Sequence, residues 1–186
     1  MKRVNLPLIA AAFLTIAAFP LPVRAETLFT PWLGVNTGTR NVSSTIDVGA
    51  SVGTMAAGVI GVDFDFGYSP VFFGNGLNSH VLTAMGNVTV GIPIGGTSSP
   101  GVRPYVTGGI GLIRARLESP FYGYSIANTD VGIDFGGGVM AFFGRHVGVR
   151  GDLRYLRSLE DDHAPFGAID LSRLDYWRTS FGLIIR

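Results

Sequence analysis

The chain has 186 residues, no cysteine and a formal net charge of +1 at neutral pH. Hydrophobic residues make up 47% and charged residues only 15%, so a strongly basic surface for nucleic acid is excluded. No apolar run after residue 25 reaches the roughly 20 residues that a membrane-spanning helix needs.

The first 25 residues have the layout of a secretory signal peptide. Lys2 and Arg3 form a short basic region, and the apolar run Leu6–Phe19 follows it. Two prolines end this run, and the small residue Ala25 stands at a suitable cleavage position. An uncleaved anchor helix is the alternative, but the run is shorter than a spanning helix requires. We therefore expect export and a mature chain that starts at Glu26.

The composition of this mature chain favours a sheet embedded in lipid. Removing residues 1–25 leaves 161 of the 186 residues, which suits one domain over residues 26–186. Three of the 14 basic residues are lost, so 11 arginines face 13 acidic residues and the net charge is −2. An exported domain without disulfides needs a sizeable core or a closed sheet in lipid. Only helices and closed barrels satisfy their backbone inside a bilayer, so an apolar chain without a spanning helix favours a barrel.

Eight segments carry alternating or β-branched patterns that predict strands. The third shows the pattern clearly, since Val62, Phe64 and Phe66 alternate with Gly61, Asp63 and Asp65. The segments are Thr27–Asn36, Ile46–Met55, Ile60–Tyr68, Val81–Ile92, Arg103–Leu117, Val131–Phe143, Val147–Tyr155 and Trp177–Ile185.

The connections between these segments alternate in length. The four that follow odd-numbered segments are long and polar: Thr37–Thr45, Ser69–His80, Glu118–Asp130 and Ser158–Leu174. Residues 56–58 and 144–146 form short turns, whereas Pro93–Val102 is longer than a tight turn. Short periplasmic turns opposite long outer loops are typical of outer-membrane barrels, and an even number of strands places both ends on the periplasmic side.

The alternation leaves open whether the apolar face meets lipid or a core. A soluble, lipocalin-like binding barrel turns its apolar face inward and covers its outside with solubilising charges. Here the polar face consists mostly of glycine with a few Asp and Arg and no lysine, which suits the lumen of a narrow membrane barrel. Aromatic residues near strand ends resemble the interfacial girdles of such barrels. They are Trp32, Tyr68, Tyr105, Phe143, Tyr155, Tyr176 and Trp177.

Three segments carry a resemblance to a known family. Gly61–Pro70, Arg103–Leu112 and Gly148–Tyr155 resemble bacterial outer-membrane β-barrel domain proteins, and more broadly the eight-stranded outer membrane protein A and X type. The resemblance implies an all-β, closed, antiparallel up-and-down transmembrane β-barrel in the cell outer membrane, with its lipids and the barrel-assembly machinery as partners. Such barrels commonly end on an aromatic residue that this machinery reads, while the present sequence ends on Arg186.

The polar face supplies the candidate site. Asp63 and Asp65 point the same way, and paired carboxylates suggest acid/base chemistry of the kind that some outer-membrane proteases perform with a histidine. We favour a structural ion-pair network, because unpaired charges in a water-poor lumen are costly. The predicted members of this lumenal network are Asp63, Asp65, Asp134, Arg150, Asp152, Arg154 and Arg178.

We expect no catalytic, cofactor or metal site. The three histidines, His80, His146 and His163, show no catalytic arrangement. The acidic run 160–162 next to His163 could hold a divalent cation, but a solvated loop is the simpler interpretation.

The predicted function is structural or a surface interaction through the outer loops. The interior of an eight-stranded barrel is about filled by side chains, which disfavours a wide channel. Loop aromatics offer contacts to a surface ligand, namely Phe72, Phe73, Phe121, Tyr122, Tyr124 and Phe166. Transport of a small solute or hydrophobic ligand is the alternative, and a lipid-modifying enzyme is a third possibility without a visible catalytic constellation.

The signal peptide gives the first testable prediction. We expect the exported protein to lack residues 1–25, because the basic region, short apolar run and small residue match a cleaved leader. N-terminal sequencing or intact-mass analysis of the membrane-extracted protein should find Glu26 first. Recovery of an intact Met1 would contradict this expectation.

Overall fold

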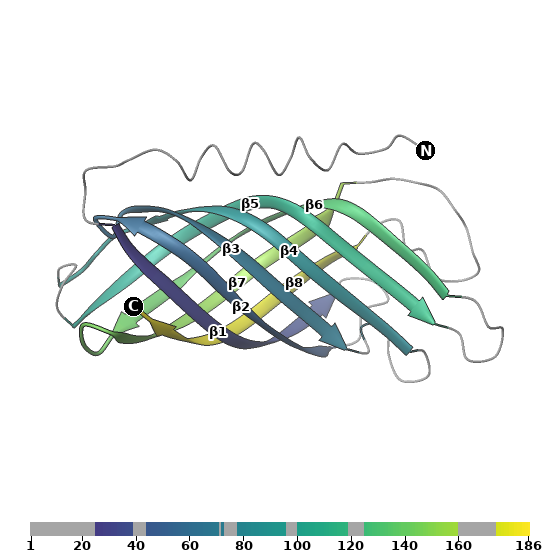
Figure 1. Ribbon diagram of the computed structural model, residues 1–186, viewed down its shortest axis with the longest axis horizontal. Coiled ribbons are helices and arrows are strands. Elements are labelled where there is room, and N and C mark those ends of the chain that lie inside the picture. Colours follow the sequence, from purple (N-terminus) through teal and green to yellow (C-terminus); the bar gives the residue numbers. More distant parts are fainter. Residues whose placement is uncertain are drawn as a thin grey trace.

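The computed structural model describes residues 25–38, 44–70, 72, 78–95, 100–118, 125–159 and 174–186. They form eight antiparallel strands, each hydrogen-bonded to its sequence neighbours, and β8 pairs with β1 to close the barrel (Figure 1). The strands are β1 (Ala25–Gly38), β2 (Thr45–Ala56), β3 (Ile60–Pro70), β4 (Asn78–Gly91), β5 (Gly101–Glu118), β6 (Ser125–Phe142), β7 (Val147–Ser158) and β8 (Asp175–Ile185). The predicted fold class is confirmed.

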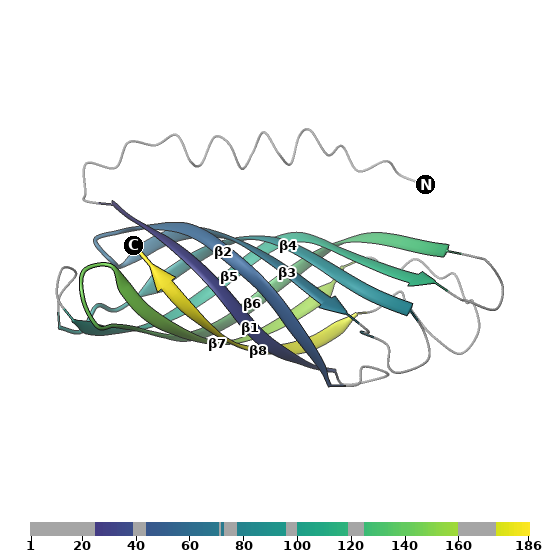
Figure 2. The same ribbon diagram turned by 60° about the horizontal axis from the view of Figure 1, so that its bottom comes forward.

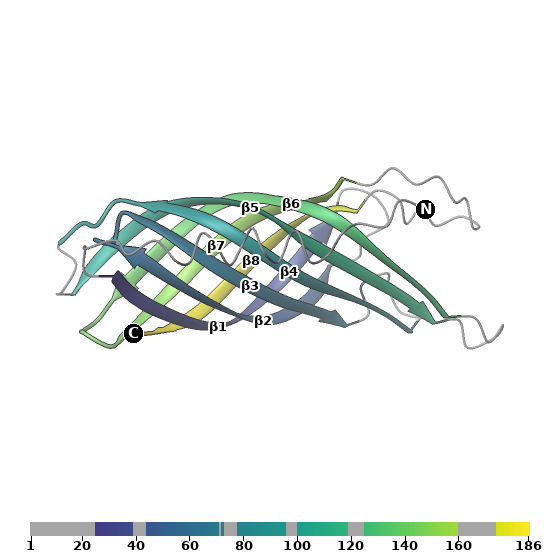
Figure 3. The ribbon, with the colours of Figure 1, turned by 45° about the horizontal axis from the view of Figure 1, so that its top comes forward.

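All eight predicted segments lie within observed strands apart from one or two end residues. The largest difference is β6, which begins at Ser125 rather than at Val131. The first six residues of β6 pair with Ile113–Glu118 at the end of β5. The β5–β6 hairpin is therefore longer than the segments whose apolar alternation predicts it. This hairpin reaches the end of the barrel opposite the start of β1 (Figure 3).

The start of β1 and the end of β8 lie at the same end of the barrel (Figure 1). The β2–β3 turn at this end is tight: the Val59 amide donates to the Ala56 carbonyl at 3.0 Å. Ala57 and Gly58 both have positive φ, at 51° and 67°, which is the type I′ geometry that suits a twisted hairpin. Gly58 also allows the Arg103 guanidinium to lie against the backbone, because a Cβ there would fall 2.6 Å from it.

The apolar face of the sheet points outward. Phe64 and Phe66 are 36% and 55% exposed, whereas Asp63 and Asp65 on the same strand are buried. Large apolar side chains are exposed on every strand, including Leu33, Ile46, Phe66, Val88, Val106, Phe135, Leu153 and Phe181. An apolar surface that encircles the molecule suits lipid and not water, so the soluble lipocalin-like alternative is wrong.

The aromatic girdle is only partly as predicted. Four of the seven aromatic residues face outward: Tyr68, Phe143, Tyr155 and Trp177. The rings of Phe135, Tyr155 and Trp177 form a continuous row across β6, β7 and β8, with centroid separations of 5.4 and 5.2 Å. The other three, Trp32, Tyr105 and Tyr176, are buried inside the barrel and are corrections to the predicted girdle.

The expected signal peptide lies outside the described residues except for Ala25, the first residue of β1. Within the described ranges, no helix is long and apolar enough to cross a membrane.

The outward orientation of Phe64 gives the second prediction. Arginine on the lipid side costs roughly 2–4 kcal/mol near the bilayer midplane and about 0–1 kcal/mol near its interfaces. Phe64→Arg, in the middle of β3, should therefore destabilise the barrel in bilayers more than Tyr68→Arg near the strand end. Urea titration of the two variants in lipid vesicles measures the difference.

A fluorophore on a cysteine at position 64 provides the control, because the sequence has no native cysteine. A quencher inside the bilayer should dim the fluorophore and an aqueous quencher should not. Dimming by the aqueous quencher alone would contradict the outward orientation.

Candidate functional site

The inward face of the barrel carries a belt of buried charges at its middle. Arg154 of β7 is its centre, with 1% of its surface exposed. Its Nη1 lies 3.2 Å from Asp134 Oδ2 on β6, and its Nε lies 3.3 Å from Asp152 Oδ1 on its own strand. Its Nη2 lies 3.8 Å from Asp63 Oδ2 on β3, across the lumen. One guanidinium thus joins strands on both sides of the barrel.

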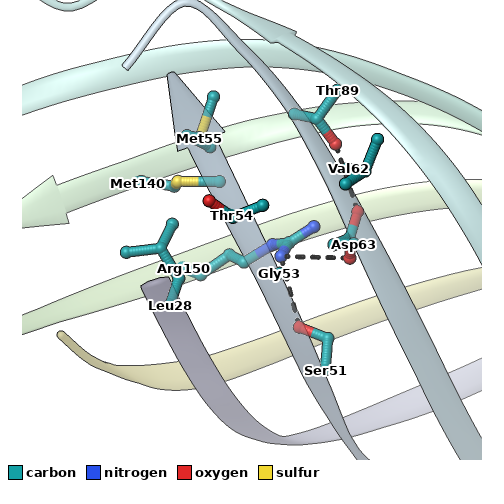
Figure 4. Close-up of a pocket in the computed structure, with 10 residues that line it drawn as sticks. All are labelled: Leu28, Ser51, Gly53, Thr54, Met55, Val62, Asp63, Thr89, Met140 and Arg150. Carbon is teal, nitrogen blue, oxygen red and sulfur yellow. Dashed lines mark hydrogen bonds and ion pairs between the residues drawn. The ribbon is translucent and has the colours of Figure 1, made fainter. Parts of the chain in front are cut away.

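Arg150, also on β7, extends the belt toward the end at which β1 begins. Its Nε lies 2.7 Å from Asp152 Oδ2, and its Nη1 lies 3.7 Å from Asp63 Oδ2. The same Nε donates to the Tyr105 hydroxyl at 2.7 Å, and Tyr105 in turn donates to Asp152. Figure 4 shows Arg150 reaching across to Asp63 and Ser51. The hydroxyl of Tyr105 therefore takes part in the network. The sequence pattern does not predict this role of Tyr105.

Arg178 of β8 forms the other part of the belt. Its Nη2 lies 2.5 Å from Asp65 Oδ1, and its Nη1 lies 3.8 Å from Asp47 Oδ2. Its guanidinium carbon lies 4.5 Å from the ring centroid of Trp32. Gly49 makes this arrangement possible, because a Cβ there would fall 2.3 Å from the indole.

Side-chain hydrogen bonds continue the belt around the wall. Ser69 Oγ donates to Asp47 Oδ1 at 2.9 Å and accepts from Asn36 Nδ2 at 2.7 Å. In the amide orientation that satisfies both its ends, Asn87 donates to Asp134 Oδ1 at 2.6 Å and accepts from Arg154 at 3.1 Å.

The structure brings all seven predicted lumenal residues into this belt. It also adds Asp47, so that five buried aspartates surround Arg150, Arg154 and Arg178. Asp47 was detectable in principle, because Asp47, Gly49, Ser51 and Gly53 alternate with apolar residues along β2. Asp65 pairs with Arg178. This pairing depends on which strands face one another across the lumen.

Apolar side chains occupy the lumen on both sides of the belt. The cluster toward the outer loops consists of Phe72, Val81, Ile113, Ala115, Leu156, Leu174 and Tyr176. The cluster toward the end at which β1 begins consists of Leu28, Met55, Tyr105, Met140, Phe142 and Ile184. Phe72 is fully buried and meets the Tyr176 ring edge-on at 5.1 Å, so it is not available to a surface ligand. The other loop aromatics considered above lie outside the described residues.

A second charge cluster lies at the end of the barrel at which β1 begins. Glu26 Oε1 binds Arg103 Nη1, and Glu26 Oε2 lies 3.1 Å from Arg186 Nη2. Both guanidiniums lie over the Phe142 ring, at 4.9 Å for Arg103 and 3.6 Å for Arg186. β1 carries Glu26, and β8 ends beside Arg186. The two strands run side by side at this end of the barrel (Figure 2). Sequence patterns do not predict this cluster, because its members are far apart in the chain.

Little space is left beside Asp63 and Arg150. A cavity of about 10 Å³ lies between Asp63, Ser51, Thr89, Met140 and Arg150 (Figure 4). That volume holds about one water molecule. Ordered side chains thus fill this part of the lumen.

The histidines do not form a site in the described part of the chain. His80 faces outward and contacts the Tyr68 ring at 5.8 Å, while His146 is exposed in the β6–β7 turn. Among the described residues, no group of three or more His, Asp or Glu side chains could hold a metal ion. His163 and the acidic run 160–162 lie outside the described residues.

A closed eight-stranded barrel with an apolar outside and a charged inside defines a bacterial outer-membrane barrel. Residues 9–183 match the family described as outer membrane protein beta-barrel domain, and the chain belongs to this family. The protein is therefore located in the outer membrane. No curated protein matches the chain significantly.

Solved structures share this fold at low sequence identity. Neisserial surface protein A is 14% identical with a TM-score of 0.64, over 87% of this chain and 97% of its own. The N-terminal β-barrel domain of Pseudomonas aeruginosa OprF is 13% identical with a TM-score of 0.55, over 87% and 98%. Ail, the attachment invasion locus protein of Yersinia pestis, is 12% identical with a TM-score of 0.53, over 87% and 98%.

The Asp65–Arg178 pair gives the third prediction. Removing one partner of a buried ion pair typically costs about 3–5 kcal/mol, because the other charge stays buried and unpaired. Asp65→Asn and Arg178→Met should each destabilise the barrel strongly, and the double variant should lose less than the sum. Urea unfolding in lipid vesicles should give a coupling free energy of about 1–3 kcal/mol.

A cycle between Asp65 and Glu26 is the matched control. Glu26 has Arg103 and Arg186 as its partners, so the two carboxylates share none and their effects should add. Additive losses for Asp65 and Arg178 as well would show that these two groups are not coupled.

Proposed function

We propose that this protein is a surface-interaction barrel: the strands form a rigid, closed scaffold, and the outer loops make the contacts. The observation that carries the proposal is the packing of the described part of the lumen, in which two apolar clusters enclose the charge belt. A barrel filled in this way offers a solute no path without displacing buried ion pairs. The side of the barrel opposite the termini is then the part available for recognition.

The names of two proteins with the same fold support this proposal. Neisserial surface protein A is named for its place on the cell surface, and Ail is named an attachment invasion locus protein. Both share the fold of this chain, and both names describe surface roles. Loops on a rigid scaffold vary readily, so a shared barrel is compatible with a different ligand.

The environment of the paired aspartates argues against acid/base catalysis. Asp63 accepts from Thr89 at 3.1 Å and lies near Arg150 and Arg154, and Asp65 binds Arg178. These cations hold the two buried carboxylates in ion pairs at the middle of the lumen. A structural role for the belt is the interpretation that we propose.

Transport of a small solute is the second candidate, and a conductance measurement separates the two. The purified protein in planar bilayers should show no stepwise conductance, because the belt and both apolar clusters block the lumen. Arg154→Ala is the matched variant, since it opens space at the centre of the belt. Frequent conductance steps from the unmodified protein would favour transport instead.

Replacement of the outer loops tests the proposed surface interaction directly. We predict that cells displaying the protein adhere to host-cell monolayers more than cells without it, and that replacing residues 161–171 by a short Gly-Ser linker reduces this adherence. Thr129→Ser, an outward change on β6, is the control that keeps every loop intact. Unchanged adherence after replacement of each of the four outer loops in turn would contradict the proposal.

A further inference from the structure

One buried carboxylate oxygen of the charge belt has no hydrogen-bond donor among the residues that the structure describes. Asp63 Oδ1 accepts from the Thr89 hydroxyl at 3.1 Å, whereas Asp63 Oδ2 accepts from none of the described groups. Arg150 Nη1 and Arg154 Nη2 lie 3.7 and 3.8 Å from this oxygen, beyond the roughly 2.7–3.2 Å of an N–H···O bond. Because a buried anionic oxygen without a donor is costly, Asp63 Oδ2 calls for a further hydrogen-bonding partner.

The small cavity in the lumen lies beside this carboxylate. Its volume of about 10 Å³ matches one water molecule, and its polar lining consists of Asp63, Arg150, Ser51 and Thr89. Figure 4 shows Arg150 directed toward both Asp63 and Ser51. Ser51 Oγ accepts from Arg150 Nη1 at 3.4 Å, so its own proton can be donated to a molecule in the cavity. A buried water typically has about two to four polar partners, and this lining supplies that number.

Apolar side chains cover the cavity toward the end at which β1 begins. Leu28, Met55 and Met140 belong to its lining, and all three are buried members of the apolar cluster at that end. Because a hydrocarbon layer separates the cavity from that opening, a molecule in the cavity exchanges slowly with bulk water.

We propose that this cavity is a binding site for a single water molecule, which donates to Asp63 Oδ2 and accepts from Arg150 Nη1. The water completes the hydrogen bonding of Asp63 and connects β2, β3 and β7 at a point where the direct contacts are long. A metal cation fits the site poorly, because two guanidiniums already lie within 3.8 Å of the same oxygen. One trapped molecule of this kind is part of the belt and requires no open path to solvent.

The methionines provide the test, since Met55 and Met140 line the cavity and the buried Met85 does not. We label the methionine methyl groups of the full barrel in lipid nanodiscs with carbon-13 and measure nuclear Overhauser transfer from water. Met55 and Met140 should show cross-peaks with the sign of a molecule that tumbles with the protein, and Met85 should show none. Absence of transfer to both Met55 and Met140, or equal transfer to Met85, would overturn the proposal.

Two substitutions of Ser51 separate a bound water from proton exchange through the serine hydroxyl. Ser51→Ala and Ser51→Val both remove the hydroxyl, but only valine fills the cavity. The cross-peaks should persist in Ser51→Ala and be lost in Ser51→Val. Loss in both variants would indicate relay through the hydroxyl, and persistence in both would show that the cavity does not hold the water; either result overturns the proposal.

Ser180→Val is the matched control, because Ser180 is a buried serine of β8 that does not line the cavity. Its cross-peaks should equal those of the unmodified protein, and their loss would contradict the assignment of the water to this cavity. If Ser51→Val does not fold, the comparison of Met55 and Met140 with Met85 in the unmodified protein still decides.

Discussion

The ion pairs that Arg154 makes inside the barrel are the interactions on which the rest of the structure depends. Lipid offers the backbone no hydrogen-bond partner, so the sheet must close on itself, and closure creates a narrow interior. Any charge in that interior needs a partner, because an unpaired buried ion costs several kcal/mol. Arg154 meets this need for Asp63, Asp134 and Asp152 together, and it joins β3, β6 and β7 across the lumen.

The belt, the two apolar clusters and the Glu26 cluster pack together inside the barrel. The belt supplies charge-assisted contacts between opposite walls, and the apolar clusters keep water from the ends of the belt. Glycines such as Gly49 leave room for large side chains like Trp32 beside the wall. The outside of the barrel is then free to meet lipid.

Strand positions and facing were predictable from sequence because a side-chain period of two needs no tertiary information. The start of β6 was not predictable in this way, because residues 125–130 lack an apolar alternation. They pair only because β5 is equally long. Trp32 and Tyr105 were assigned to the wrong face, because an aromatic ring suits either a girdle or a filled lumen. The pairing of Asp65 with Arg178 and of Glu26 with Arg103 depends on which strands face one another across the closed barrel, and local patterns do not contain that information.

Exchange of the arginine Nε protons tests most directly whether the charge belt is sealed from water. Arg154 is 1% exposed in the lumen, while Arg114 is exposed on the outer wall. NMR of the barrel in lipid after transfer to deuterated buffer should show the Arg154 Nε–H signal persisting long after that of Arg114 has disappeared. Equally fast exchange at both positions would show that water reaches the belt and would contradict a closed lumen.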